Sequence, residues 1–322
     1  MPEPVFSNPP DDLRGRMTAL HLFVCLLGLS AAGLFGSTSC GGVEAHQAWE
    51  RDVLEVQTLH DRNKYDEAEQ RYRSLLEQAD DPDQRRYVRL QLAKLALDRG
   101  NVQEAKSRYR SIWRETVEDA HGGRALDAHA RLVRRTGDDR RANQLLAKLI
   151  TRYPETSWAE QAAQKLATWH NDHGQLAELP ETFERLHEEV GQTTVGDDLW
   201  YVLARAFAEA SDPPTALLYF DRVIDEHPKG DRVDDAEWEA AQLHLARQEW
   251  GAAVDKLERV ADRFIPSWFI GSYSSPHASK ARYRLGFIHL THLSDYETAI
   301  GHFEQYLDDF PANPRADDAL LH

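Results

Sequence analysis

The chain has 322 residues, of which 29% are charged, 9% are aromatic and 32 are glycine (18) or proline (14). This composition is typical of a folded, helix-rich protein, and it excludes a disordered or collagen-like chain. The formal net charge of −16 disfavours nucleic acid and anionic lipid as partners over most of the surface.

The first 39 residues have the pattern of an export signal. Arg14 and Arg16 precede the uncharged run MTALHLFVCLLGLSAAGLFG, and the small residues STS follow it. A basic flank, an apolar segment and small residues before a cleavage point are the features of a secretory signal. We therefore expect residues 1–39 to direct the rest of the chain out of the cytoplasm.

Cys40 would be the first residue and the only cysteine of the mature chain, because Cys25 lies inside the apolar run. An internal disulfide bond is then excluded. Cys40 resembles the lipidated cysteine of bacterial lipoproteins, with Ser37 at the position where the usual motif has leucine. The resemblance implies a lipid anchor at Cys40, a tether at 40–45 and a periplasmic location at the outer membrane. An ordinary cleaved signal and an uncleaved membrane anchor are the alternatives.

A pattern of small and apolar residues recurs every 37 residues from about residue 46. Each unit has an anchor residue, an apolar residue twelve positions before it, and apolar residues four and seven positions after it. The anchors are Ala68, Ala105, Ala142, Leu179, Ala216 and Ala253. The next match, Ala299, follows after 46 residues, so nine residues are inserted. Such a period indicates a stack of similar units.

Each unit is predicted to be a pair of helices. Apolar residues at i, i+4 and i+7 form one face of a helix, and the upstream apolar residue belongs to a preceding helix. Gly100, Gly137 and Gly174 share one column between the helices, where glycine can adopt the left-handed conformation that ends a helix. In the fourth unit Leu179 replaces the alanine and Pro180 follows, so its second helix should start late or bend.

These units resemble the tetratricopeptide repeat. The fifth unit carries nearly the full signature of that family, at Trp200, Leu203, Ala204, Phe207, Ala216, Phe220 and Pro228. The resemblance covers residues 46–322 and implies an all-α, right-handed solenoid of about seven helix pairs. A loop is inserted near 265–279, and the chain stops in the first turns of a further, incomplete repeat.

Motifs for catalysis are missing from the sequence. It contains no nucleophile elbow, phosphate-binding loop, HExxH or paired-cysteine metal motif. The family resemblance implies the binding of proteins. We therefore expect no enzyme activity, no cofactor and no small-molecule substrate.

Four arginines crowd the first helix of the third unit: Arg124, Arg131, Arg134 and Arg135. They are candidates for a patch that binds an acidic partner on an otherwise acidic protein. The cluster is too short for a nucleic-acid site. The alternative is a solvated helix face balanced by neighbouring carboxylates.

In tetratricopeptide arrays the first helices line a concave groove, and the position fifteen residues before the anchor points into it. In the C-terminal units this position holds aromatic residues, provided that the seventh unit contains one extra loop residue. The inserted loop adds further aromatic residues. Aromatic side chains dominate interface hot spots, so we expect them to bind an extended segment or a helix of an envelope protein. The alternative is that these rings pack against the neighbouring first helix. The predicted partner-binding residues are Tyr201, Trp238, Tyr283, Phe287, Trp268, Phe269 and Tyr273.

His289 and His292 stand three residues apart on one predicted helix, with His244 and His302 nearby in repeat terms. A metal site needs two histidines and further ligands that converge on one point. His244 and His289 instead occupy the column that Phe207 fills in the fifth unit. We interpret them as core or interface histidines and predict no metal site.

An export signal combined with such repeats resembles the outer-membrane assembly lipoproteins of the BamD-like group and the repeat-bearing periplasmic protein of the Tol-Pal system. The resemblance implies a non-catalytic, lipid-anchored periplasmic scaffold that acts in outer-membrane assembly or envelope maintenance through protein contacts. The alternative is the docking solenoid of a cell-wall enzyme of the lytic transglycosylase type whose catalytic domain is absent from this chain. A reading frame that continues into a domain with a catalytic glutamate would favour this second interpretation.

Overall fold

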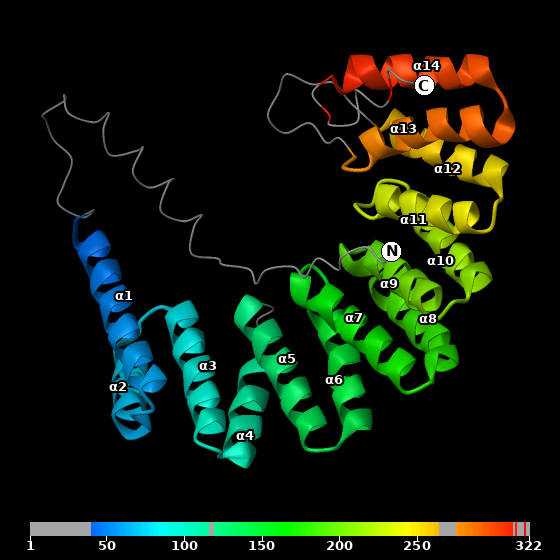
Figure 1. Cartoon of the computed structure of the whole chain (residues 1–322). Helices are drawn as coiled ribbons and strands as arrows, with labels where there is room; N and C mark the ends of the chain where they lie inside the picture. Colours follow the sequence, from blue (N-terminus) through cyan, green and yellow to red (C-terminus); the bar gives the residue numbers. More distant parts are fainter. Residues whose placement is uncertain (1–39, 116–118, 264–274, 312, 314–318, 320–322) are drawn as a thin grey trace, which may run out of the picture. The chain divides into compact units, whose positions relative to one another are not determined.

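The computed structural model describes residues 40–115, 119–263, 275–311, 313 and 319 (Figure 1). Every regular element within these residues is a helix, which confirms the all-α prediction for this part of the chain. The signal predicted over residues 1–39 lies outside it. No helix among the described residues combines the length and apolarity needed to cross a membrane.

The chain divides into two units, Met1–Glu55 and Val56–His322. The described part of the first unit is the N-terminal portion of α1 (Cys40–Asp61), so residues 40–45, predicted as a tether, form the first turns of a helix. The second unit holds the end of α1 and the other helices of the described chain.

The second unit is a series of helix pairs, one pair to each predicted repeat. From α2 to α7 and from α8 to α14, each helix packs against the one that follows it. The odd-numbered helices are the first helices of repeats and the even-numbered ones are the second helices. Their bounds are α2 (Tyr65–Gln78), α3 (Pro82–Asp98), α4 (Val102–Trp113), α5 (Ala120–Arg135), α6 (Asp139–Arg152), α7 (Ser157–Asp172), α8 (Leu179–Val190), α9 (Val195–Glu209), α10 (Pro213–Glu226), α11 (Val233–Ala246), α12 (Trp250–Asp262), α13 (Ala278–Ile288) and α14 (Tyr296–Asp309).

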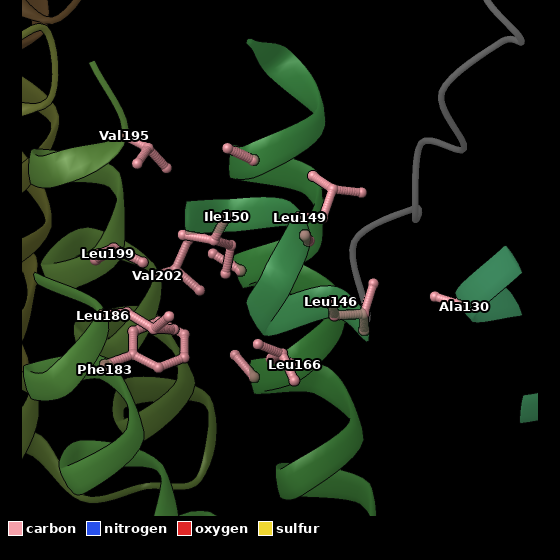
Figure 2. Close-up of a cluster of buried hydrophobic side chains, with 14 of the residues drawn as sticks. Ala130, Leu146, Leu149, Ile150, Leu166, Phe183, Leu186, Val195, Leu199 and Val202 are labelled. Atoms are coloured by element: carbon pink, nitrogen blue, oxygen red, sulfur yellow. The ribbon is translucent and has the colours of Figure 1, made fainter. Parts of the chain in front are cut away.

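The repeat columns read from the sequence form the core. The six anchors from Ala68 to Ala253 each have 0% exposure, and the apolar residues at the three related positions are buried as well. Small anchors let paired helices approach closely, while the larger residues fill the space on either side. Figure 2 shows a section where α6 to α9 meet, with Ile150, Leu166, Phe183 and Val202 in one cluster.

The turn between the two helices of each repeat contains one left-handed residue. Gly100, Gly137 and Gly174 have φ angles of 89°, 88° and 66°, as predicted from their shared column. The same column is left-handed in the other repeats, where it holds Asn63 (φ 60°), Ser211 (φ 62°), Gln248 (φ 61°) and Ser294 (φ 55°). The turn geometry is therefore set by the packing of the helix pair, and glycine only lowers its cost.

Repeat four departs from the others in the predicted way. The helices α6 and α10 begin three residues before their anchors, whereas α8 begins at its anchor, Leu179. The three preceding residues, Leu176–Glu178, form a 3-10 turn, with Pro180 in the first turn of α8. Proline suits this position because the first turn needs no N–H donor. At this junction α7 packs directly on α9 of the next repeat.

Repeat seven contains the extra loop residue that its spacing requires. It is accommodated in a π turn, η2 (His289–Leu293), between α13 and α14. Ala299, Phe303 and Tyr306 of α14 are buried, so the core columns continue into this repeat. The π turn therefore absorbs the extra residue without disturbing the periodic core.

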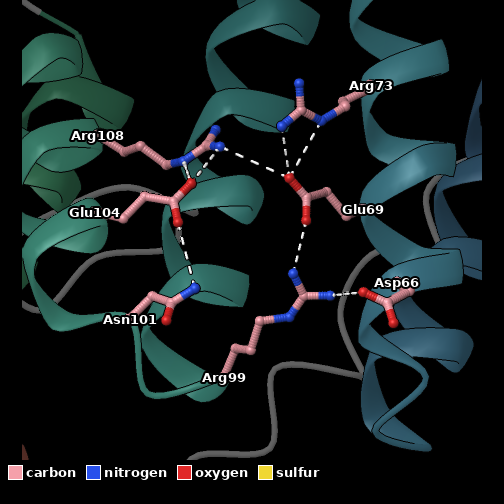
Figure 3. Close-up of polar contacts among 7 residues, drawn as sticks. All are labelled: Asp66, Glu69, Arg73, Arg99, Asn101, Glu104 and Arg108. Carbon is pink, nitrogen blue, oxygen red and sulfur yellow. Dashed lines mark hydrogen bonds and ion pairs between the residues drawn. The ribbon is translucent and has the colours of Figure 1, made fainter.

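Ion pairs join repeats one and two (Figure 3). Glu69 accepts hydrogen bonds from Arg73 (2.7 Å) and Arg99 (2.9 Å), Arg99 also pairs with Asp66, and Arg108 lies 3.9 Å from Glu69. The hydrogen bond from Arg73 is the main reason that the pKa of Glu69 lies below its ordinary value. Such partly exposed pairs contribute little each, so their main effect is to fix how the two repeats align.

Candidate partner-binding site

A hollow of about 350 Å³ lies among α11, α12 and α13. We call it the aromatic hollow; its lining residues are Leu245, Trp250, Tyr283, Arg284, Phe287, Ile288 and His292. Of the seven predicted partner-binding residues, it brings together Tyr283 and Phe287. Trp268, Phe269 and Tyr273 lie outside the described residues.

The π turn shapes one wall of the aromatic hollow. It carries His292 over Trp250, the first residue of α12, so that the rings stack with centroids 3.8 Å apart and planes 7° apart. Phe287 meets His292 edge-on at 6.5 Å and is 40% exposed, whereas its neighbour Ile288 is buried. A large exposed ring beside a buried apolar residue can cover an incoming apolar side chain.

Tyr283 and Arg284 form the side of the hollow that joins it to the core. The ring of Tyr283 packs edge-on against Phe303 (5.7 Å) and Tyr306 (5.6 Å) of α14. Arg284 donates from Nη1 to Gln242 Oε1 at 2.5 Å. This side of the hollow is therefore held in place by contacts with α11 and α14.

Trp238, on α11, lies outside the hollow and is half-buried. The ring of His277 is stacked on it at 5.0 Å with a 5° interplanar angle, and the guanidinium of Arg284 lies 5.5 Å from its centroid. Both neighbours come from the next repeat. Trp238 thus packs against the following repeat, and only part of its surface is accessible to a partner.

Tyr201, on α9, is likewise half-buried and separate from the hollow. It contacts Phe220 at 5.9 Å, and the guanidinium of Arg232 lies 5.3 Å from its centroid. Burial raises the pKa of Tyr201 to about 12, so its hydroxyl remains protonated at neutral pH. The aromatic column is therefore not one continuous strip, since cationic and imidazole groups separate its members.

Arg232 joins three repeats through carboxylates. Its Nε donates to Asp198 at 2.6 Å, its Nη1 lies 3.5 Å from Asp235, and it also pairs with Glu160. Burial raises the pKa of Asp198 to about 6, and the hydrogen bond from Arg232 opposes part of that rise. These contacts fix the first helices α7, α9 and α11 relative to one another, which positions Tyr201.

A second hollow, of about 280 Å³, lies between α3 and α5. Its charged lining residues include Lys94, Arg124, Arg131 and Arg135, with Asp98 as the acid, and we call it the basic hollow. Three of the four predicted patch arginines therefore meet there. Lys94 joins them from the preceding repeat, which the sequence reading did not find.

Arg134, the fourth predicted arginine, does not line the basic hollow. Its guanidinium hydrogen-bonds Asn143, lies 3.7 Å from Asp139 and sits over the ring of Trp169 at 5.8 Å. Burial lowers the pKa of Arg134. On a helix, Arg134 and Arg135 are adjacent in sequence and point in different directions, which explains the split.

Of the four histidines considered in the sequence, His289 is buried and His244 and His302 are half-buried, whereas His292 is exposed and stacks on Trp250. His289 is 9% exposed, and its ring centroid lies 5.4 Å from that of His302. His244 Nδ1 lies 2.7 Å from a carboxylate oxygen of Glu249. A different set, His187, Glu226 and His227, is the one group of potential metal ligands found among the described residues.

Two models of the tetratricopeptide repeat match the chain, at residues 124–156 and 239–314. These residues fall on α5 and α6 and on α11 to α14, so the chain carries tetratricopeptide repeats, as its sequence predicts. No curated protein matches the chain.

Several solved structures are similar to the chain. The C-terminal part of a TPR repeat-containing protein from Cytophaga hutchinsonii is 15% identical; the match covers 83% of this chain and 98% of that one, with a TM-score of 0.42. The pilF protein of Pseudomonas aeruginosa is 14% identical, with coverage of 74% and 98% and a TM-score of 0.37. YrrB, described as a TPR protein with an unusual peptide-binding site, is 17% identical, with coverage of 66% and 98% and a TM-score of 0.37. At these identities the likeness concerns the fold alone.

Proposed function

We propose that this tetratricopeptide-repeat chain is a non-catalytic, lipid-anchored scaffold of the bacterial envelope that binds a protein partner in its aromatic hollow. The observation that supports it most directly is the meeting of Trp250, Tyr283 and Phe287 around one hollow of about 350 Å³. The role in outer-membrane assembly or envelope maintenance rests on the export signal and on the lipoprotein families that the sequence resembles.

The walls of the hollow indicate what the partner offers. Three aromatic rings, the imidazole of His292 and two aliphatic side chains make a mainly apolar surface, with Arg284 as its cationic member. An apolar side chain inserted there would leave water, which contributes about 1.5–3 kcal/mol for a leucine- or phenylalanine-sized group. The partner is therefore an extended or helical segment that carries an apolar anchor with an acidic residue beside it.

Site-specific photo-crosslinking in intact cells tests this proposal. A photoreactive phenylalanine analogue at Phe287 should crosslink to a discrete envelope protein, and the added substitution Trp250→Ala should abolish the product. Leu218 on α10 provides the matched control, because it is an apolar side chain with 57% exposure outside the hollow. Crosslinks of equal yield from positions 287 and 218, or none from 287, would contradict the proposed site.

The lipid anchor requires a separate test, because Cys40 is independent of the hollow. A Cys40→Ala variant should lose labelling by a fatty-acid analogue and should leave the membrane fraction. Cys25→Ala is the matched control, since Cys25 lies in the segment that cleavage would remove. Several acyl chains hold a protein firmly on a membrane, whereas one holds it only weakly. Unchanged labelling of Cys40→Ala would exclude the anchor.

The basic hollow supports a second contact, with an acidic segment. Lys94, Arg124 and Arg135 line it together in a chain whose formal net charge is −16. A hexaglutamate peptide should bind the full chain and lose affinity in Arg124→Glu. Arg140→Glu, an exposed arginine of α6 outside the hollow, is the control and should have little effect. Equal losses in the two variants would show only a general effect of charge.

A further inference from the structure

His187, Glu226 and His227 meet where the C-terminal ends of α8 and α10 come together. His187 lies in the last turn of α8, Glu226 is the last residue of α10, and His227 follows it. The two histidine Nε2 atoms are 2.8 Å apart, and Glu226 Oε2 lies 3.8 Å from His187 Nε2. One potential ligand atom from each residue lies within 4.8 Å of the other two.

Neighbouring side chains hold this cluster in position. The indole of Trp200, which is fully buried, packs against the His187 ring at 4.5 Å and donates from Nε1 to Glu226 Oε2 at 3.0 Å. Arg222 donates from Nε to the other oxygen, Oε1, at 2.6 Å. Hydrogen bonds from surrounding residues that fix the direction of a carboxylate are characteristic of metal sites.

Two glycines leave room for the imidazole rings. A Cβ atom on Gly191 would lie 2.6 Å from His187 Cε1 and 2.7 Å from His187 Nε2. A Cβ atom on Gly196 would first meet the backbone of Gly191 and would also lie 2.9 Å from His227 Cε1. Gly191 has a φ angle of −61°, so glycine is needed there for space beside the ring and the carbonyl oxygen of His187, which lies 2.6 Å from the added Cβ, and not for its backbone conformation.

Two chemical states suit a pair of Nε2 atoms that face each other. In one, a single proton lies between the rings, so that one Nε2 donates and the other accepts. In the other, both Nε2 atoms are unprotonated and direct their lone pairs to one metal ion. The carboxylate beside them is a third ligand in the second state, and in the first it can form an ion pair with a protonated His187.

We propose that His187, Glu226 and His227 bind one divalent transition-metal ion of the zinc class. Two imidazoles and one carboxylate are a common zinc ligand set, and copper or nickel would compete for the same atoms. Glu226 and His227 also line a hollow of about 380 Å³, through which water can reach the fourth coordination position. The single carboxylate, already paired with Arg222, offsets only part of the ion's charge.

The ion would join repeat four to repeat five. This junction is the irregular one, because α8 starts late and α7 packs more extensively on α9 than α3 does on α5 or α5 on α7. A metal bridge between the ends of α8 and α10 would add a direct link between the two second helices. Since the ion binds only the folded arrangement, it would raise the melting temperature of the chain.

The test uses the full chain purified in detergent, with Zn²⁺ and Co²⁺ alone as probes. The wild-type chain should bind one Zn²⁺ at this site by calorimetry, and Co²⁺ should give the visible absorption of tetrahedral coordination. His187→Phe keeps a ring on Trp200 but removes one ligand, and His227→Gln removes the other imidazole. Each of these variants alone should lower the affinity for Zn²⁺ by at least about 100-fold. Glu226→Gln should lower it by about 10-fold.

His173→Gln is the matched control, because His173 is exposed, follows the last residue of α7 and is not one of the three residues of the cluster. It should leave Zn²⁺ affinity and the Co²⁺ spectrum unchanged. Absence of a Co²⁺ spectrum in the wild-type chain, or an identical spectrum in His227→Gln, would overturn the proposal and leave a shared proton as the reason for the contact. Circular dichroism of each variant separates loss of a ligand from loss of the fold, and His227→Gln decides if His187→Phe unfolds.

Discussion

The basic hollow and the aromatic hollow occupy corresponding places in the repeat series and differ in chemistry. Leu97 lines the first and Leu245 the second, and the two leucines are 245 − 97 = 148 residues apart, which is four periods of 37. Around Leu97 the walls carry Lys94 and Arg124, whereas around Leu245 they carry Trp250 and Phe287. The repeat therefore determines where a hollow lies, and residues outside the repeat columns determine what it can bind.

The same two regions differ in their turns. Repeats two to four place glycine at the left-handed position, while repeats five to seven place Ser211, Gln248 and Ser294 there. The backbone conformation is alike in both regions, so the region with the aromatic hollow bears more conformational strain.

The largest expected effect concerns the aromatic hollow. Trp250→Ala combined with Phe287→Ala should weaken binding of the segment identified by crosslinking by at least about 100-fold, or about 3 kcal/mol. Raising the salt concentration should have little influence on that binding, because the contact is mainly apolar. Titration calorimetry at two salt concentrations measures both effects. Normal binding of the segment by the double variant would show that the aromatic hollow is not its binding site.

Acid should destabilise the region of the basic hollow through His129. Its ring is 2% exposed, and its Nδ1 accepts a hydrogen bond from Trp113 Nε1 at 3.1 Å, so the ring is neutral in the folded chain. Burial, followed by the charges of nearby arginines, lowers the pKa of His129 from 6.5 to about 4. Between these values the unfolded chain binds the extra proton, so stability falls as pH decreases from about 6.5 to about 4.

The lowered pKa of His129 should reduce the free energy of unfolding at acid pH by about 2 kcal/mol, after allowance for solvent screening. His129→Gln can still accept from Trp113 but does not titrate in this range, so its stability should depend less steeply on pH. Urea unfolding at pH 7 and pH 4.5 gives the difference. His173→Gln, with an exposed ring, should keep the wild-type pH dependence. A slope in His129→Gln equal to that of the wild type would show that other groups cause the acid sensitivity.

The sequence predicted the core almost position by position, because each repeat column reports on packing inside one helix pair. Anchor burial, the glycine turns, the late start of α8 and the extra residue of repeat seven all follow from that local periodicity. The hollows were predicted only in part. Lys94 and Trp250 come from elements next to the ones that carried the predicted residues, and their approach depends on how successive repeats stack.

The cluster of His187, Glu226 and His227 was missed for a related reason. Its two histidines are 40 residues apart, which differs from the period of 37, so they fall in different columns. They meet because both lie near the C-terminal ends of neighbouring second helices, and Gly191 leaves space beside the His187 ring. A search for histidines near the ends of successive second helices would have found them.

A smaller effect should separate the two hollows by their response to salt. Arg124→Glu together with Arg135→Glu should weaken hexaglutamate binding by about 10-fold. The affinity of the wild-type chain for this peptide should fall when the salt concentration rises from about 50 to about 200 mM, because salt screens exposed charge contacts. The same variant should leave partner binding in the aromatic hollow unchanged. Fluorescence titration of labelled peptide measures the first effect. If this variant also weakened the aromatic hollow, the two regions would be energetically coupled and the comparison would need revision.

The smallest expected effects come from the left-handed turn position and have opposite signs in the two regions. In Gly137→Ala the new Cβ meets nothing within 4 Å, so the cost is the backbone strain of an alanine at φ 88°, about 1 kcal/mol. Gln248→Gly removes a similar strain at φ 61°, but glycine makes the unfolded chain more flexible, which leaves a gain of a few tenths of a kcal/mol. The side chain of Gln248 is exposed, and its backbone N–H still donates to Leu245 at 3.0 Å, so little else changes. Urea midpoints should therefore fall for Gly137→Ala and rise slightly for Gln248→Gly. A fall in both would mean that the Gln248 side chain, rather than the turn conformation, supports the C-terminal repeats.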